Sequence, residues 1–361
     1  MNKVFLDHGA STPVCKEVLT KLNEMATDFY NSNSIYEKGL ENRKEIEEVR
    51  KKVAKMINAE PNEIYFTCSA SESNTLCIDG FLKRHSDYDV ICSALEHSSI
   101  YNNPNIDYVI PCDENGFIDI EYIKGFKRKS LFAIMHSSNE LGIINPIKSI
   151  SDIIHRRGGY LLCDASSSFG KVKIDVKELD VDFLTASGYK IGSLNGVGIC
   201  YIREGIDIAS LIIGNQEKGI RGGTQNSLAI KSLGIAIDNL KLFDKVSEVK
   251  NYLAEQLEAI DDVIINSSKD GLPNLVNFTM KNISLESDQL VSLLDEFGFM
   301  VSSSSACNGY KRTPSHVLKA IGLSDFEANR TIRVTLGHEN TFKEMDSFVE
   351  CIKLILNMDI K

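Results

Sequence analysis

No run of 18 or more apolar residues occurs in the 361-residue chain, so the sequence predicts no membrane-spanning helix. The segment from Met1 to Asp7 contains no long apolar stretch, and we therefore expect no secretory signal. Repeats and low-complexity tracts are absent apart from a short serine run at 302–305. The remaining class is an ordinary globular protein, which the 43% hydrophobic and 25% charged composition supports.

Basic residues are also in deficit. The chain has 40 Lys and Arg against 50 Asp and Glu, a formal net charge of −10. A surface that binds nucleic-acid backbone needs clustered Lys and Arg. The charge balance therefore argues against direct nucleic-acid binding.

The nine cysteines are odd in number and scattered, and no CxxC pair occurs among them. Several lie inside apolar runs, as Cys92, Cys163 and Cys200 do. This distribution predicts neither a disulfide framework nor a metal site such as a zinc centre. It fits a protein of the reducing cytoplasm.

Short apolar runs alternate with helical patterns between residues 60 and 203. The runs are rich in Ile, Val, Phe and Tyr, as expected for strands buried on both faces. Such alternation predicts an α/β fold with a mostly parallel seven-stranded sheet covered by helices. The expected strands are Glu63–Cys68, Asp89–Ala94, Tyr108–Cys112, Leu131–His136, Tyr160–Asp164, Phe183–Ala186 and Gly198–Ile202.

Helical spacing of apolar residues predicts helices at Glu37–Asn58 and Ile147–Arg157 within this region. The pattern changes after about residue 227, where one long helix is expected over Ser227–Ile260. The remainder predicts a smaller α+β unit with an apolar run at Leu275–Met280 and a strand at Thr331–Leu336. Helices are expected there at Asp288–Phe297 and Phe342–Leu356. We expect a large domain over 12–240 and a small domain over 241–361 together with 1–11.

Polar clusters follow several of the predicted strands, where ligands of open α/β sheets bind. Ser69 to Asn74 follows one strand and begins a helix, so its N–H groups and hydroxyls suit a phosphate. Simple helix capping by Ser71 is the alternative. Asp164 ends a buried strand and needs a cationic partner, which a protonated pyridine nitrogen, a structural ion pair or a helix cap would each satisfy.

Two basic residues and one thiol complete the set. Lys190, in Ser-Gly-Tyr-Lys after a strand, suits a Schiff base, although a surface lysine is the plainer interpretation. Arg333 lies inside an apolar strand, where it needs a substrate carboxylate or a buried salt bridge. Cys307, in Ser-Ser-Ser-Ser-Ala-Cys-Asn-Gly, lies in a segment typical of a surface loop rather than a core.

Taken in order, these clusters resemble the cysteine desulfurases, a group of the class-V, fold-type I pyridoxal-phosphate (PLP) enzymes. LDHGASTPV is similar to the group's opening LDNAATTPV, and EIYFTCSASESN to EIIFTSGATESN. Further matches follow in the right order over some 330 residues: SALEH, MHSSNELGIINPI, CDASSSFGKVKIDV, SGYK, RGGTQN, SSSSACN and TIRVTLG.

The resemblance implies a role for each matched residue. Lys190 holds the cofactor through a Schiff base, Asp164 pairs with the pyridinium nitrogen, and His97 stacks on the ring and shuttles a proton. Four residues of one subunit surround the cofactor phosphate: Ala70, Ser71, Ser187 and Tyr189. Thr224 reaches the same phosphate from the other subunit of a homodimer.

The same resemblance implies the reaction. Asn139 and Arg333 hold the carboxylate of L-cysteine, and Lys190 removes the Cα proton. The Cys307 thiolate attacks the substrate sulfur, which leaves a persulfide on Cys307 and releases L-alanine. The implied partner is a sulfur-acceptor protein: an iron–sulfur scaffold, a tRNA-thiolation factor or a thiamine-pathway carrier.

Several positions depart from the group's pattern. Ser167 stands where a glutamine donates to the phenolic oxygen of the cofactor, and Tyr189 replaces a histidine before the lysine. His8-Gly9 replaces Asn-Ala, and Ser32 and Tyr36 replace a proline and a histidine. Three alternatives remain: a selenocysteine lyase, another class-V C–S lyase or aminotransferase, or a low-activity relative that acts mainly by binding.

Overall fold

The computed structural model describes residues 3–303 and 313–359. Its largest feature is a seven-stranded sheet with the order β2-β8-β7-β6-β5-β3-β4. Strands β3 to β7 run parallel to one another, and β8 runs antiparallel between β2 and β7. The mostly parallel α/β sheet predicted from the sequence is therefore confirmed. Its strands are β2 Ile64–Thr67, β3 Asp89–Ser93, β4 Tyr108–Ile110, β5 Ser130–Ala133, β6 Tyr160–Asp164, β7 Phe183–Ser187 and β8 Gly198–Ile202.

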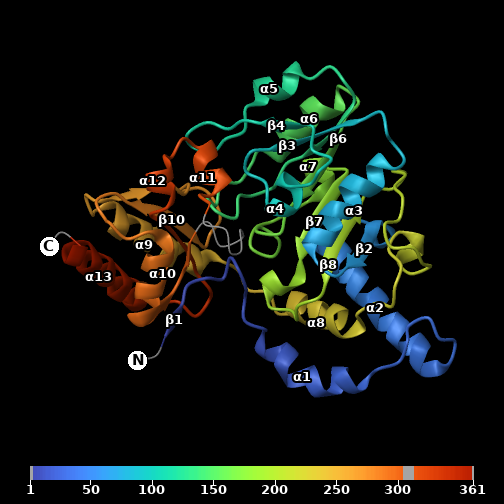
Figure 1. Cartoon of the computed structure of the whole chain (residues 1–361). Helices are drawn as coiled ribbons and strands as arrows, with labels where there is room; N and C mark the ends of the chain where they lie inside the picture. The colour runs from blue at the N-terminus through green and yellow to red at the C-terminus, as the bar shows by residue number, and fades with distance from the viewer. Residues whose placement is uncertain (1–2, 304–312, 360–361) are drawn as a thin grey trace.

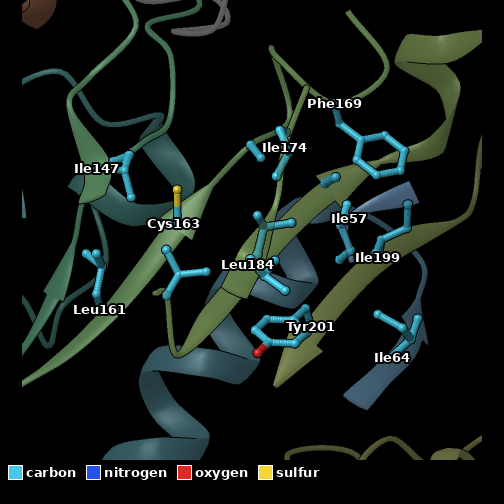
Figure 2. Packing of buried hydrophobic residues seen from close by; sticks show 14 of the residues in the cluster. Ile57, Ile64, Ile147, Leu161, Cys163, Phe169, Ile174, Leu184, Ile199 and Tyr201 are labelled. Atoms are coloured by element: carbon cyan, nitrogen blue, oxygen red, sulfur yellow. The ribbon is translucent and has the colours of Figure 1, made fainter. Parts of the chain in front are cut away.

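Both faces of this sheet are covered, which explains the near-continuous apolar strands. Along β6, Leu161 and Cys163 pack into one hydrophobic cluster while Leu162 packs into another on the opposite face. Figure 2 shows the first cluster, where Leu161, Cys163, Leu184, Ile199 and Tyr201 lie together on the sheet.

Helices supply the other side of each cluster. The first cluster takes residues from α2 (Glu37–Met56), α6 (Ile147–His155) and α8 (Ser227–Asp238), and the second from α3 (Ala70–Leu82) and α4 (Ser98–Tyr101). The other helices near the sheet are short or peripheral: α1 Lys16–Thr27, α5 Ile120–Gly125, α7 Val176–Leu179, and the 3-10 turns η1 Pro61–Glu63, η2 Gly188–Ile191 and η3 Glu217–Gly219.

A second, separate core is built from the C-terminal third and the N-terminal strand (Figure 1). Its four-stranded sheet has the order β12-β13-β10-β9, and β1 pairs in parallel with β11. The strands are β1 Val4–Phe5, β9 Val263–Ile265, β10 Leu275–Met280, β11 Phe299–Met300, β12 Ser302–Ser303 and β13 Thr331–Thr335. The helices are α9 Asp244–Glu258, α10 Ser287–Glu296, α11 His316–Ala320, α12 Asp325–Ala328 and α13 Phe342–Asp359.

The long helix expected over Ser227–Ile260 is wrong. The chain forms two helices there, α8 and α9, separated by residues 239–243. Apolar residues of α8 pack into the core of the large sheet, whereas those of α9 pack into the second core. Because one straight helix presents a single apolar stripe, it could not serve both cores.

Among the described residues, no helix combines the length and the apolar character needed to cross a membrane. The same residues contain no group of three or more His, Cys, Asp or Glu side chains arranged to hold a metal ion.

A buried ion pair ties the segment 217–225 to the large sheet. Arg50 on α2 donates to Glu217 at 2.7 Å, and the two side chains are 5% and 1% exposed. Glu217 also accepts the backbone N–H of Phe66 at 3.0 Å and a hydrogen bond from the side chain of Gln225. The segment 217–225, which carries the Arg-Gly-Gly-Thr motif, is therefore anchored to α2 and β2.

We expect Glu217→Gln to lower the free energy of unfolding by about 3 kcal/mol, because the buried Arg50 would keep only the half-exposed Glu47 as an anionic partner. Urea-induced unfolding measures this change. The matched control is Asp295→Asn, which breaks the half-exposed ion pair with Lys3. That change should cost less than about 1 kcal/mol, and equal losses in the two variants would contradict the prediction.

Candidate active site

One pocket lies at the carboxyl ends of the parallel strands, where β3, β5, β6 and β7 end. Residues that are far apart in sequence line it together. Nine of the predicted site residues are present: Ala70, Ser71, His97, Asn139, Asp164, Ser167, Ser187, Tyr189 and Lys190. The sequence analysis missed five further lining residues: Asn74, Ser99, Met135, Ser137 and Ser166.

The N-terminus of α3 forms one wall. Ser69 is the N-cap of this helix, and its hydroxyl accepts the backbone N–H of Glu72 at 3.1 Å. Capping by Ser71, the alternative considered above, is therefore wrong. The backbone N–H of Ala70 donates to the Ser187 hydroxyl at 3.2 Å. First-turn N–H groups and hydroxyls thus converge at the positive end of a 13-residue helix, an arrangement that suits an anion.

Asp164 ends β6 and is 5% exposed. Its carboxylate accepts the backbone N–H of Ser166 at 2.8 Å and the Asn74 side-chain amide at 2.9 Å. Both donors are neutral, so they satisfy hydrogen bonds without compensating the charge. A cationic ring N–H in the pocket would supply that compensation.

His97 lies beside this carboxylate at the N-cap of α4. Its Nδ1 accepts the backbone N–H of Ser99 at 3.2 Å and lies 2.9 Å from the Ser99 hydroxyl. Burial lowers the pKa of His97, the negative charge of Asp164 partly opposes this, and the positive charge of Lys190 adds to it. The fields of Asp164 and Lys190 therefore both reach the imidazole.

Lys190 lies in the 3-10 turn that follows β7. Its backbone carbonyl accepts the Thr12 hydroxyl at 3.1 Å, which ties the turn to the N-terminal segment. A second amine is close by, because burial and the charge of Lys190 lower the pKa of Lys171 to about 7. Lys171 donates to the backbone carbonyl of Ser167 at 3.0 Å.

Arg333 reaches the edge of the pocket from β13. It donates to the Asn139 carbonyl at 3.0 Å and to the Asp7 carboxylate at 3.1 Å, so the expected buried salt bridge exists. Among the described residues, its buried Nε has no hydrogen-bond partner. One donor of the guanidinium therefore remains for another acceptor.

Glu140, which follows Asn139, links the edge of the pocket to the C-terminal third of the chain. Burial raises the pKa of Glu140 to about 7, although its hydrogen bond from Ser315 and the charge of Arg333 oppose the shift. The Ser315 hydroxyl donates to Glu140 at 2.6 Å. His316 lies 3.0 Å from the Glu96 carbonyl and stacks on Tyr101.

Among the predicted residues, Arg333 is not one of those that line the pocket. Thr224 is exposed and does not line it. Cys307 lies outside the residues that the structure describes.

The missed lining residues carried only weak sequence signals. Asn74 lies four residues after Ala70, hence on the same face of α3, and Ser99 follows His97 by two residues. Helical periodicity could have placed Asn74 beside the pocket. No sequence pattern showed that it reaches Asp164.

The residues present fit PLP. Buried hydroxyls of Ser137 and Ser166 line the pocket and have no hydrogen-bond partner among the described residues. Such orphaned groups suit a polar ligand. The pocket also contains a lysine, which suits the aldehyde of PLP, and a buried carboxylate, which suits its pyridine nitrogen. The N-terminus of α3 suits its phosphate.

Comparisons with known proteins agree with this chemistry. The family model described as aminotransferase class-V matches residues 4–348. A curated relative named cysteine desulfurase IscS, from Clostridium botulinum, is 34% identical over 380 residues, covering 99% of this chain and 95% of that protein.

Solved structures give the same result. A NifS-like protein from Rickettsia africae superposes with a TM-score of 0.89 at 30% identity, covering 99% of this chain and all of the other. A structure described as SspA in complex with cysteine has a TM-score of 0.81 at 31% identity, covering 93% and 99% of the two chains. The chain therefore belongs to the class-V aminotransferase family and, within it, to the cysteine desulfurases.

Proposed function

We propose that this chain is a PLP-dependent cysteine desulfurase that converts L-cysteine to L-alanine and holds the sulfur as a persulfide on Cys307. The observation that carries the proposal is the pocket itself. It brings Lys190, Asp164 and His97 together from the ends of separate strands, beside the N-terminus of α3. Each of these groups matches a different part of the cofactor.

Lys190 would bind the aldehyde of PLP, and Asp164 would hold the pyridine nitrogen in its protonated form. Ala70, Ser71 and Ser187 would hold the phosphate, together with Tyr189. When bound, this cofactor withdraws electrons from the substrate Cα and so makes its proton easier to remove. The low-dielectric surroundings of Asp164 strengthen its interaction with a ring cation.

The substrate carboxylate would lie against Arg333 and Asn139. The support is the buried Nε of Arg333, which leaves a donor for a carboxylate oxygen. A homologous structure, SspA, contains cysteine. Lys190 would then take the Cα proton.

The sulfur step uses Cys307. Its thiolate would attack the sulfur of the bound substrate, forming an S–S bond as the Cβ–S bond breaks. The electron pair of that bond would pass to the remaining three-carbon unit, which would take up a proton at Cβ, regain the Cα proton from Lys190 and leave as alanine. The persulfide would pass to an acceptor protein in the cytoplasm, an iron–sulfur scaffold or a thiolation factor.

Ser167 and Tyr189 distinguish this pocket from the group's usual one. Ser167 lines the pocket but is shorter than the glutamine that it replaces, and Tyr189 brings a hydroxyl without a positive charge. We therefore propose normal cofactor retention with altered cofactor electronics and slower turnover.

We expect Cys307→Ser to retain the visible absorption band of the bound cofactor while alanine formation from L-cysteine falls to background, because the attacking thiolate is gone. Lys190→Ala should lose the band, because the amine that would bind the cofactor aldehyde is gone. It should also reduce alanine formation by at least about 100-fold, because the base for the Cα proton is removed. Spectra and assays of alanine and sulfide measure both effects.

Cys68→Ser is the matched control, since Cys68 is an exposed thiol outside the pocket. It should behave as the unaltered protein. Alanine and sulfide formation that survives Cys307→Ser would instead indicate a C–S lyase. A band that does not respond to cysteine would indicate a different substrate or a binding protein.

We further propose a homodimer in which Thr224 enters the partner's pocket. The segment around Thr224 adjoins the loop that precedes α2, because the Ser32 hydroxyl donates to Gln225 at 2.8 Å. This surface exposes large apolar side chains, with Ile35 88% and Ile213 87% exposed. Apolar groups of this size on one surface suit burial against a second copy.

Light scattering should therefore give twice the monomer mass of 40.2 kDa. Ile213→Asp should shift the protein toward monomer, because a charge would be buried at the interface. Leu242→Asp is the control, since Leu242 is 83% exposed in the α8–α9 connection. A monomeric unaltered protein, or equal effects of the two substitutions, would contradict the proposal.

A further inference from the structure

Asn74 is fully buried on α3 and makes hydrogen bonds in three directions. Its side-chain nitrogen donates to Asp164 at 2.9 Å and to the Ser99 hydroxyl at 3.0 Å. Its side-chain oxygen accepts the Thr185 hydroxyl at 2.6 Å. One amide therefore links the end of β6 and the middle of β7 with the segment that begins α4.

The orientation of this amide is fixed by its partners. A carboxylate is an acceptor only, so the NH₂ group of Asn74 must face Asp164. Its second N–H then reaches Ser99, and the carbonyl oxygen is left for Thr185. The reversed amide would place its carbonyl oxygen against the carboxylate, which would leave two acceptors facing each other.

The direction of hydrogen bonding continues from Ser99 to His97. A backbone N–H can only donate, so the Nδ1 atom that accepts it from Ser99 carries no proton. The Ser99 hydroxyl, which accepts from Asn74, can direct its own proton to the same Nδ1 at 2.9 Å. The imidazole proton must therefore lie on Nε2.

This arrangement also opposes a second proton on the ring. Protonation at Nδ1 would set the ring N–H against the backbone N–H of Ser99, a contact between two donors, and would force the Ser99 hydroxyl to turn its own proton away. Burial acts in the same direction by lowering the pKa of His97. The charged groups whose fields involve this ring are Asp164, which favours the cation, and Lys190, which opposes it, with His316 also close enough to interact.

We propose that Asn74 is a positioning residue that joins Asp164 and His97 in one directed hydrogen-bond unit and holds His97 as a neutral imidazole with its proton on Nε2. The proposal rests on the proposed function in that both residues would contact the cofactor ring. It also refines that function. His97 acts as a hydrogen-bond donor, and removal of the substrate proton is left to Lys190.

The test is the tautomer of His97 in the full-length protein labelled with ¹⁵N-histidine. Ring-nitrogen NMR signals distinguish the Nε2–H form, the Nδ1–H form and the imidazolium, and His97→Gln assigns the signal. Spectra are recorded between pH 6 and 8 on the protein as purified with its cofactor. They are repeated after the cofactor is removed. We expect the neutral Nε2–H form throughout this pH range.

Asn74→Ala should release this constraint, since Ser99 loses the donor that orients its hydroxyl. The His97 signal should then show both neutral tautomers or a titration midpoint about one pH unit higher. The matched control is Cys77→Ala, which removes another fully buried side chain from α3 outside the pocket. It should leave the His97 signal unchanged.

An Nδ1–H or imidazolium signal in the unaltered protein at pH 7 would overturn the proposal. So would a His97 signal that Asn74→Ala and Cys77→Ala change equally. The unaltered protein alone tests the tautomer, even if Asn74→Ala does not fold. Because the readout is independent of turnover, a missing cysteine response with the expected tautomer would reject the proposed function and not the hydrogen-bond unit.

Discussion

The burial of the Asp164 carboxylate at the end of β6 is the constraint on which the rest of the site depends. A carboxylate taken out of water is costly unless hydrogen bonds and a counter-charge replace the solvent. Ser166 and Asn74 provide the hydrogen bonds, and both are neutral. The side chain is therefore prepared for a cationic ligand. A mostly parallel sheet suits such a site, because it brings the carboxyl ends of several strands together at one edge.

The same lack of solvent changes the neighbouring ionisable groups. Burial raises the pKa of Glu96 to about 8, raises that of Glu140 to about 7 and lowers that of His136 to about 4. Near neutral pH these groups tend toward their uncharged forms. Fewer neighbouring charges then interact with Asp164 and Arg333. These two side chains therefore contribute more of the electrostatic field at the pocket.

The sequence predicted the large sheet well because buried parallel strands appear as short apolar runs, and β6 and β8 match their predicted ranges. It failed at 239–243, where the separation into α8 and α9 depends on which core each helix contacts, a tertiary property. Ordered motifs predicted Asp164 and Lys190 as site residues, and both line the pocket. Asn74 was missed because its importance lies in contacts with Thr185, Ser99 and Asp164, whose geometry no local pattern records.

The departures at Ser167 and Tyr189 are easier to interpret once the hydrogen bonds are known. Both positions line the pocket, but neither takes part in the bonds that join Asp164, Asn74, Ser99 and His97. In the proposed complex, substitution at these positions would change the contacts to the cofactor's phenolic oxygen and phosphate, while the carboxylate and the imidazole would keep their orientation. The two departures from the group's pattern therefore lie outside the buried hydrogen-bonded unit. This separation argues for altered kinetics rather than for a lost activity.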